Sequence, residues 1–172
     1  MKNFARPIFS LLITLLLSAC SATGPKFSVA TQPTKNEVLI YLYRPDAIFF
    51  GGIQSYFYVD GTKVASLNKE GYTAFYLPPG THLFKQHWAG MDNAKDTIQF
   101  SIELEPGETR YYRLTIGLQS FGMAPGYKSV FISASHKWAI TNVPESDALR
   151  EIGLTNYQPP FDVKGTREIG KE

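Results

Sequence analysis

Three histidines are the side chains of this sequence best suited to bind a metal ion, and two of them, His82 and His87, stand close together. They lie five positions apart in a stretch whose residue types predict a β-strand. Because side chains alternate between the two faces of a strand, an odd separation directs these imidazoles to opposite faces. We therefore predict no metal site, and we expect His82, which follows a Pro-Gly turn, to hydrogen-bond that turn.

Two further stretches contain residue types used in catalysis, but in the wrong pattern. Residues 117–122 place Ser120 between glycines, with one residue too many before the serine for a nucleophile elbow and without the Lys-Ser/Thr of a phosphate-binding loop. Asp92 and Asp96 favour a solvated loop, with a weak calcium site as the alternative. We predict no catalytic residues, and the enzymatic hypothesis that stays open is an active site assembled from distant loops.

Apolar residues in loops are the strongest sign of a binding surface. Ile48, Phe49 and Phe50 lie beside two glycines, and Phe121 and Met123 lie in a glycine-rich loop, where water normally favours polar side chains. If these side chains meet at one end of the fold, they form an exposed apolar patch suited to a partner or to lipid. The alternative is that they fold back and cover the end of the core.

A leader precedes the only cysteine of the chain, Cys20. Lys2 and Arg6 give a basic start, and residues 8–17 form an apolar run, which together are typical of a secretory signal. The run is too short to remain in the bilayer, because a spanning helix needs about 20 apolar residues. We therefore expect residues 1–19 to be a signal peptide that is removed.

The residues Leu17-Ser18-Ala19-Cys20 resemble the lipobox of bacterial lipoproteins, Leu-[Ala/Ser/Thr]-[Gly/Ala]-Cys. The resemblance implies that the chain is cleaved between Ala19 and Cys20, that the Cys20 thiol carries a diacylglyceryl group and that the freed amine is acylated as well. Because several acyl chains hold a protein permanently in a membrane, this covalent lipid is the only cofactor we expect. The alternative is an ordinary signal peptide with a cysteine nearby.

The residue after Cys20 bears on the location of the protein. In Gram-negative lipoproteins this residue influences sorting, and Ser21 is not the aspartate associated with inner-membrane retention. The resemblance therefore implies the periplasmic face of the outer membrane. Removal of Lys2 and Arg6 with the leader leaves equal numbers of basic and acidic residues, so we expect no nucleic-acid partner.

The remaining chain is long enough to form one domain with its own core, and its single cysteine excludes an intrachain disulfide. Residues 20–36 are rich in Ser, Thr, Gly and Pro, which predicts a lipidated, flexible tether with an average span of about 20 to 25 Å. Residues 37–153 form the predicted domain. We expect residues 154–172 to be an extended or disordered tail.

Short apolar runs separated by turn residues predict an all-β fold. Residues 38–43 form an unbroken apolar run that is typical of a central strand buried on both faces. Asp60-Gly61 predicts a hairpin turn between strands 56–59 and 63–67, and Pro78-Pro79-Gly80 predicts a second hairpin. Further strands are expected at 97–104, 112–116, 130–132 and 138–143, with a short helix at 144–152.

About seven to nine such strands predict an antiparallel β-sandwich with one short C-terminal helix, and a closed barrel is the alternative. Several motifs follow one another in order: Tyr43-Arg44-Pro45, Gly51-Gly52, Tyr58-Val59-Asp60-Gly61, Lys63-Val64, Gly71-Tyr72 and Pro79-Gly80-Thr81-His82. In this order they resemble the bacterial family catalogued as domain of unknown function 2846, which is similar to PEGA-type modules. The match covers residues 37–140 and consists largely of turn residues, so it implies a fold and no particular chemistry.

These features together predict an outer-membrane-anchored, nonenzymatic lipoprotein that acts as a binding or assembly module for an envelope protein or glycan. Tyrosines such as Tyr56, Tyr58, Tyr111 and Tyr127 either line a half-exposed sheet face or stack on sugars of the envelope. The alternative functions are an envelope enzyme and a periplasmic lipoprotein that binds a small ligand or a metal.

Overall fold

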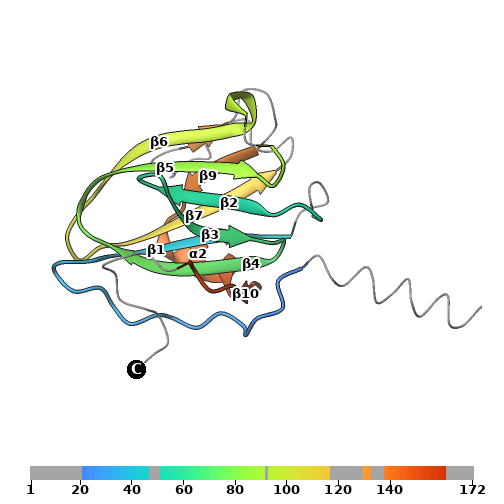
Figure 1. Cartoon of the computed structure of the whole chain (residues 1–172). Coiled ribbons are helices and arrows are strands. Elements are labelled where there is room, and N and C mark those ends of the chain that lie inside the picture. Colours follow the sequence, from blue (N-terminus) through green and yellow to red (C-terminus); the bar gives the residue numbers. More distant parts are fainter. Residues whose placement is uncertain (1–20, 47–50, 92, 117–129, 133–137, 162–172) are drawn as a thin grey trace, which may run out of the picture.

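The computed structural model describes residues 21–46, 51–91, 93–116, 130–132 and 138–161, which form two β-sheets packed face to face (Figure 1). The predicted all-β sandwich is therefore confirmed. One sheet has the strand order β10-β4-β1-β7-β9-β8, with β1 (Val38–Arg44), β4 (Gly71–Leu77), β7 (Thr109–Ile116), β8 (Val130–Ile132), β9 (Trp138–Asn142) and β10 (Asn156–Tyr157). The other has the order β3-β2-β5-β6, with β2 (Ser55–Val59), β3 (Thr62–Leu67), β5 (Gly80–Trp88) and β6 (Thr97–Leu104).

The strand β1 lies in the middle of the six-stranded sheet, between β4 and β7, and every one of its residues is buried. This confirms the central strand that the apolar run predicts. The Asp60-Gly61 hairpin between β2 and β3 is also confirmed, since both turn residues have positive φ angles, 49° and 79°. A β-bulge between Phe57 and Tyr58 interrupts the register of that hairpin.

The second predicted hairpin is wrong, because the Pro78-Pro79 turn carries the chain from one sheet to the other. β4 pairs with β1 and β10, whereas β5 pairs with β2 and β6. The turn after β6 at Pro106-Gly107 makes a similar crossing, and β7 therefore enters the six-stranded sheet parallel to β1. β10 is parallel to β4 as well, so the sheet is mixed rather than fully antiparallel.

The predicted helix is present as α2 (Glu145–Ile152), which begins directly after Pro144 and ends at Gly153. The acidic residues of its first turn and Arg150 in its last turn interact favourably with the helix dipole. Ala148 and Ile152 are its buried residues, and they pack on the outer face of the six-stranded sheet. The described helices include none that combines the length and the apolar character needed to cross a membrane.

The core consists of two layers. Between the sheets, Trp88 and Trp138 are fully buried and meet edge to face at 5.8 Å between ring centroids. Outside the six-stranded sheet lies a second, tyrosine-rich layer, in which Tyr41 and Tyr111 stack with centroids 4.9 Å apart. The second layer exists because β1 has large side chains on both faces, so each face must be covered.

Arg44, the last residue of β1, is fully buried. Its Nη1 donates to the carbonyl of Ile53 at 2.7 Å and faces the carbonyl of Leu67 at 3.4 Å, and the guanidinium lies 4.8 Å from the centre of a Trp88 ring. Burial lowers the pKa of Arg44 to about 10, so the side chain stays charged at neutral pH. The arginine ties the connection before β2 to the end of β3.

Residues 21–36, which we call the N-terminal strap, lie against the domain instead of forming the predicted free tether. Ser21 pairs with Lys69 in the turn between β3 and β4, and the N–H of Ala22 donates to the carbonyl of Lys69 at 2.9 Å. Lys26 then pairs with Asn156 of β10. Figure 1 shows the strap as the blue chain that runs along the sandwich to the start of β1.

Tyrosines of the second core layer hold the strap in place. Phe27 packs edge-on against Tyr41 and Tyr72, at centroid distances of 5.8 and 5.2 Å. The hydroxyls of Tyr72 and Tyr41 accept from the N–H groups of Ser28 (3.2 Å) and Ala30 (2.8 Å), and the Tyr76 hydroxyl donates to the carbonyl of Thr31 (2.5 Å). The polar composition of the segment is thus compatible with docking, because its backbone supplies most of the contacts.

The chain after α2 is also placed on the sandwich as far as the structure describes it. Thr155 is buried, β10 pairs with the first residues of β4, and the N–H of Phe161 donates to the carbonyl of Val64 at 2.9 Å. The segment therefore passes from an edge of one sheet to the β3 edge of the other.

Candidate binding surfaces

The residues of the predicted lipid anchor and apolar patch, Ala19, Cys20, Ile48, Phe49, Phe50, Phe121 and Met123, lie outside the described residues. The structure does show where the strands next to the two apolar stretches end. β1 and β7 are parallel neighbours, with Tyr43 opposite Arg113, so both strands end at the same end of the sandwich.

The outer face of the four-stranded sheet presents five aromatic and basic side chains, which we call the aromatic–basic face. Four of them are half-exposed, Tyr56 and Tyr58 on β2, Lys63 on β3 and Lys85 on β5, and the fifth, His87 on β5, is buried. Their alternate neighbours in sequence, such as Phe57 and Phe84, point into the core. The position of β2 between β3 and β5 brings all five together.

Strand pairing fixes how these side chains meet. Tyr56 lies directly opposite His87, and Tyr58 lies opposite Lys85 on one side and Lys63 on the other. The His87 ring stacks on Tyr58 at 5.3 Å and meets Tyr56 edge-on at 5.6 Å. Its Nδ1 donates to the carbonyl of Trp88 at 3.1 Å, which fixes the ring between the two tyrosines.

The two lysines lie over the tyrosine rings. The Lys63 ammonium is 3.5 Å from the centre of the Tyr56 ring and 4.8 Å from that of Phe161, and the Lys85 ammonium is 5.9 Å from the Tyr58 ring. Such cation–π contacts at half-exposed sites contribute about 0.5–1 kcal/mol each. They hold the long lysine side chains down, so that the ammonium groups line the same surface as the rings.

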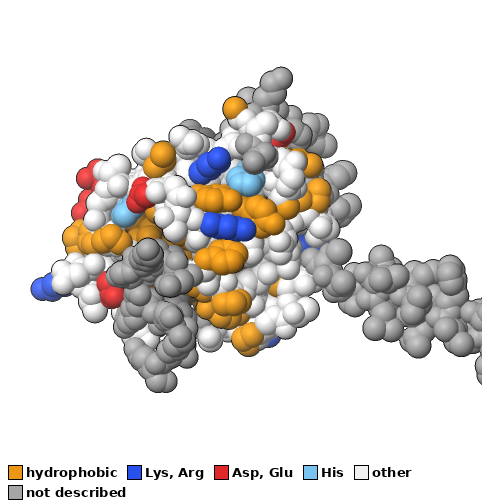
Figure 2. All heavy atoms as spheres, in the orientation of Figure 1, with side chains coloured by type: hydrophobic (Ala, Val, Ile, Leu, Met, Phe, Trp, Pro, Cys, Tyr) orange, Lys and Arg blue, Asp and Glu red, His pale blue; other side chains and the backbone are white. Residues whose placement is uncertain are grey.

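No acidic residue occurs in β2, β3 or β5. The aromatic–basic face is therefore locally positive, although residues 21–172 as a whole carry equal numbers of basic and acidic side chains. Figure 2 shows orange, blue and pale-blue side chains gathered in the middle of this face, and the acidic side chains in red lie away from it. Half-exposed rings next to ammonium groups are suited to a ligand with flat apolar surfaces and negative charge.

Only part of this face is predictable from the sequence. The alternation in the β2–β3 hairpin identifies Tyr56 and Tyr58 as residues of a half-exposed face, whereas Tyr111, for which the sequence predicts the same kind of face, is buried. Lys63 has the same alternation signal, whereas Lys85 and His87 join the face only because β5 pairs with β2 instead of β4. Lys85 and His87 therefore cannot be assigned to this surface from the sequence alone.

The two neighbouring histidines differ in surroundings, as their spacing predicts. His82 points to the core side of β5 and His87 to the aromatic–basic face. Nε2 of His82 donates to the carbonyl of Pro78 at 2.9 Å, and Nδ1 lies 2.6 Å from Oδ2 of Asp60, so His82 does bond the turn that precedes it. Within the described residues, no group of three or more His, Cys, Asp or Glu side chains is arranged to hold a metal ion.

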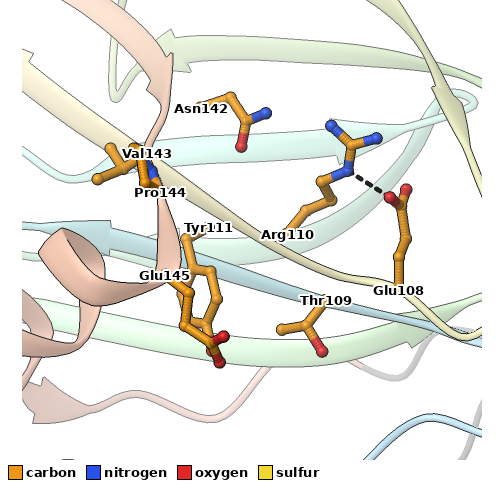
Figure 3. A pocket seen from close by; sticks show the side chains of 8 residues that line it. All are labelled: Glu108, Thr109, Arg110, Tyr111, Asn142, Val143, Pro144 and Glu145. Atoms are coloured by element: carbon orange, nitrogen blue, oxygen red, sulfur yellow. Dashed lines mark hydrogen bonds and ion pairs between the residues drawn. The ribbon is translucent and has the colours of Figure 1, made fainter. Parts of the chain in front are cut away.

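A pocket of about 280 Å³ lies on the other sheet, where β7 begins and β9 passes into α2 (Figure 3). It is lined by residues 108–111 from one side and residues 142–145 from the other. Nε of Arg110 donates to Glu108 at 2.7 Å, and the hydroxyl of Tyr111 donates to Glu145 at 3.0 Å. Figure 3 shows the first of these pairs as a dashed line across one side of the pocket.

The ionisable groups of this pocket bond to one another, as one ion pair and one hydrogen bond. Burial, together with the hydrogen bond to Glu145, raises the pKa of the Tyr111 hydroxyl, so the phenol remains a proton donor to that carboxylate. Arg110 likewise engages Glu108. The Tyr111–Glu145 hydrogen bond joins the start of β7 to the first turn of α2, whereas the Arg110–Glu108 pair is local to the start of β7. Neither contact pairs a general acid with a general base.

No protein-family model, curated protein or solved structure matches this chain.

Proposed function

We propose that this chain is a nonenzymatic envelope lipoprotein, anchored by acyl chains on Cys20, that binds an anionic glycan on the aromatic–basic face. The anchoring part of the proposal is supported by the leader and by the lipobox-like residues before Cys20. We place the protein at the periplasmic face of the outer membrane, because Ser21 is not the aspartate associated with inner-membrane retention. Apart from the covalent lipid, the proposal requires no cofactor.

The observation that carries the glycan proposal is the pairing of Tyr56 and Tyr58 with Lys63 and Lys85 on strands that contain no acid. Sugar rings have apolar C–H faces that pack well on flat aromatic side chains, and tyrosine adds a hydroxyl that exchanges hydrogen bonds with sugar hydroxyls. Two ammonium groups beside the rings favour sugars that carry carboxylate or phosphate groups.

The geometry of the sheet also favours an extended ligand. Tyr56 and Tyr58 are two positions apart on one strand, so their Cα atoms are separated by about 6.5 Å. This spacing is close to the length of one sugar residue, and the rings therefore can engage neighbouring parts of a glycan chain. A pocket is not needed for such a ligand, because Tyr56, Tyr58 and Lys85 are half-exposed on the surface of the sheet.

The pocket between β7 and α2 favours a structural role over catalysis. Its two carboxylates are engaged by Arg110 and Tyr111, and the Tyr111–Glu145 bond connects β7 to α2, which must stay together for α2 to cover the sheet. We therefore place the biological activity on the four-stranded sheet and assign the pocket to the stability of the domain.

The proposal is tested with the mature, full-length lipoprotein in mild detergent. We expect it to retain acidic envelope glycans on an array or in a pull-down, and we expect Tyr56→Ala with Tyr58→Ala to weaken that binding at least about tenfold, which corresponds to about 1.4 kcal/mol. Lys63→Ala with Lys85→Ala should reduce both the affinity and its dependence on salt, because the lost contacts are charged.

The matched control is Gln99→Ala with Ser101→Ala, which changes two exposed residues of β6 on the same sheet face. This variant should bind as the unaltered chain does. Double-stranded DNA serves as a probe of charge alone and should bind weakly and independently of the tyrosines. Binding of acidic glycans that survives loss of both tyrosines, or no binding to any glycan, would contradict the proposal.

A further inference from the structure

We infer that the N-terminal strap holds one defined end of the sandwich against the bilayer surface, so that the domain does not stand off on a flexible tether. The inference rests on the proposed acylation of Cys20. It goes beyond that proposal, because an acyl anchor alone says nothing about which side of a domain faces the lipid.

The strap determines where the anchor must be. Ser21 is paired with Lys69, and Ala22 is buried and bonded both to Lys69 and to the side chain of Asn156, whose Nδ2 donates to the Ala22 carbonyl at 2.8 Å. Consecutive Cα atoms are about 3.8 Å apart, so the Cα atom of Cys20 lies within about 3.8 Å of that of Ser21. Since Ser21 is paired with Lys69, the lipid is attached close to the turn that contains Lys69. A free tether of the same residues would span about 20 to 25 Å on average.

The turn at Lys69 lies at the end of the sandwich where β1, β3 and β5 finish and β2, β4 and β6 begin. Strand register shows this directly, since Arg44 is opposite Gly71 and Ser55 is opposite Trp88. We call it the anchor end. The opposite end carries the turns at Asp60-Gly61, Pro78-Pro79 and Pro106-Gly107.

Several independent contacts keep the strap on the domain. The N–H of Tyr157 donates to the carbonyl of Pro25 at 2.7 Å, and Phe27 is wedged against Tyr41 and Tyr72. The fit is closest at Gly24, where an added Cβ would lie 1.9 Å from the carbonyl oxygen of Tyr157. A larger side chain there cannot be accommodated unless the backbone of the strap or of β10 moves.

With the anchor end on the membrane, the strands point away from the bilayer and the aromatic–basic face is turned sideways. A glycan lying next to the membrane can then run across this face without displacing lipid. The nine residues of β5 give the sandwich a height of about 25–30 Å between its two ends.

The inference is tested by energy transfer from single labels on the domain to acceptor-labelled lipid. Cys20 is the only cysteine, and its thiol is consumed by acylation, so an introduced cysteine is the only thiol to label. Ala94→Cys marks the anchor end and Thr62→Cys marks the opposite end; both residues are exposed. The acylated chain is reconstituted in vesicles of phosphatidylethanolamine and phosphatidylglycerol.

We expect strong transfer from position 94 and weak transfer from position 62. Gly24→Val should make the transfer efficiencies from positions 94 and 62 similar, because the added side chain displaces the strap from Tyr157. Thr23→Val, at the neighbouring exposed position, should preserve the difference between the two efficiencies. Phe27→Ala is a second way to release the strap, in case Gly24→Val fails to fold by circular dichroism.

Equal transfer from the two positions in the unaltered chain would overturn the inference, and so would a difference that persists in both strap variants. The mass of the mature protein separates this result from failure of the anchor: a chain without acyl groups refutes the anchor and the orientation together, whereas an acylated chain with equal transfer refutes only the orientation. Glycan binding is measured separately and does not depend on either result.

Discussion

Asp60 shows how one turn residue can serve both backbone geometry and electrostatics. It has a positive φ angle in the β2–β3 turn, and its carboxylate accepts from the N–H of Leu83 at 2.8 Å and faces His82 at 2.6 Å. Burial alone would raise the pKa of Asp60, but the hydrogen bonds from Leu83 and His82 outweigh it and hold the pKa below its ordinary value. The turn is thereby fastened to β5.

A lowered pKa makes the stability of the domain depend on pH in a defined direction. The contribution of Asp60 is complete above its unfolded-state pKa of about 3.9 and is lost as the pH falls through the lower folded-state value. Asp60→Asn keeps a residue type that tolerates positive φ but removes the charge. We expect it to reduce the free energy of unfolding by about 1 kcal/mol at pH 6, since the half-exposed carboxylate is screened by water.

Urea unfolding of the two proteins between pH 2 and pH 6, a range of about four units around the ordinary carboxyl pKa, provides the measurement. The two free energies should converge at the acidic end of the range. A constant difference across the range would mean that the substitution perturbs the turn geometry rather than the charge, and would refute the electrostatic explanation.

At the scale of elements, the strap illustrates a limit of sequence reasoning. Its Ser, Thr, Gly and Pro content correctly indicates a segment without a core of its own. Its partners, however, are Tyr41, Tyr72, Tyr76 and residues of β10, and nothing local in the strap indicates that these distant hydroxyls bond to its backbone. The composition of a segment predicts whether it can fold alone, but it does not predict whether the segment docks on the rest of the domain.

Phe27 provides a test of that docking. The half-buried ring packs edge-on against two tyrosines, so Phe27→Ala should lower the free energy of unfolding by about 1–2 kcal/mol. Val29→Ala is the control in the same strap, because Val29 is 61% exposed and loses little contact. If both variants unfold at the same denaturant concentration as the unaltered chain, the strap contributes nothing to stability.

For the strands, the sequence likewise predicts the ends of the elements but not which strands pair. Turn residues mark the ends of β2, β3, β5 and β6 at positions close to those predicted, because Asp-Gly and Pro-Gly act through local φ angles. Which strands pair is decided by burial across the whole sandwich. Gly80, with φ of 124°, ends a crossing between sheets rather than a hairpin, and neither its identity nor that of Pro79 distinguishes the two.

At the scale of the whole molecule, the predicted anchor requires the thiol of Cys20. Without the Cys20 thiol there is no atom to receive the diacylglyceryl group, and a lipoprotein signal peptidase acts only on the modified precursor. We therefore expect Cys20→Ser to accumulate as an uncleaved precursor without acyl chains, measured by intact mass after membrane fractionation. A normally processed, soluble Cys20→Ser product would contradict the lipoprotein assignment.

The order in which the strap acquires its partners has a consequence for biogenesis. Tyr157, whose N–H donates to the carbonyl of Pro25, lies near the other end of the described chain, so the strap cannot complete its contacts until that late segment is available and α2 has formed. Until then residues 21–36 are a long, flexible connection, which is accessible to processing enzymes and leaves the strands free to pair. Docking of the strap shortens this connection, so on the proposed acylation of Cys20 the completion of the fold itself brings the domain close to the membrane.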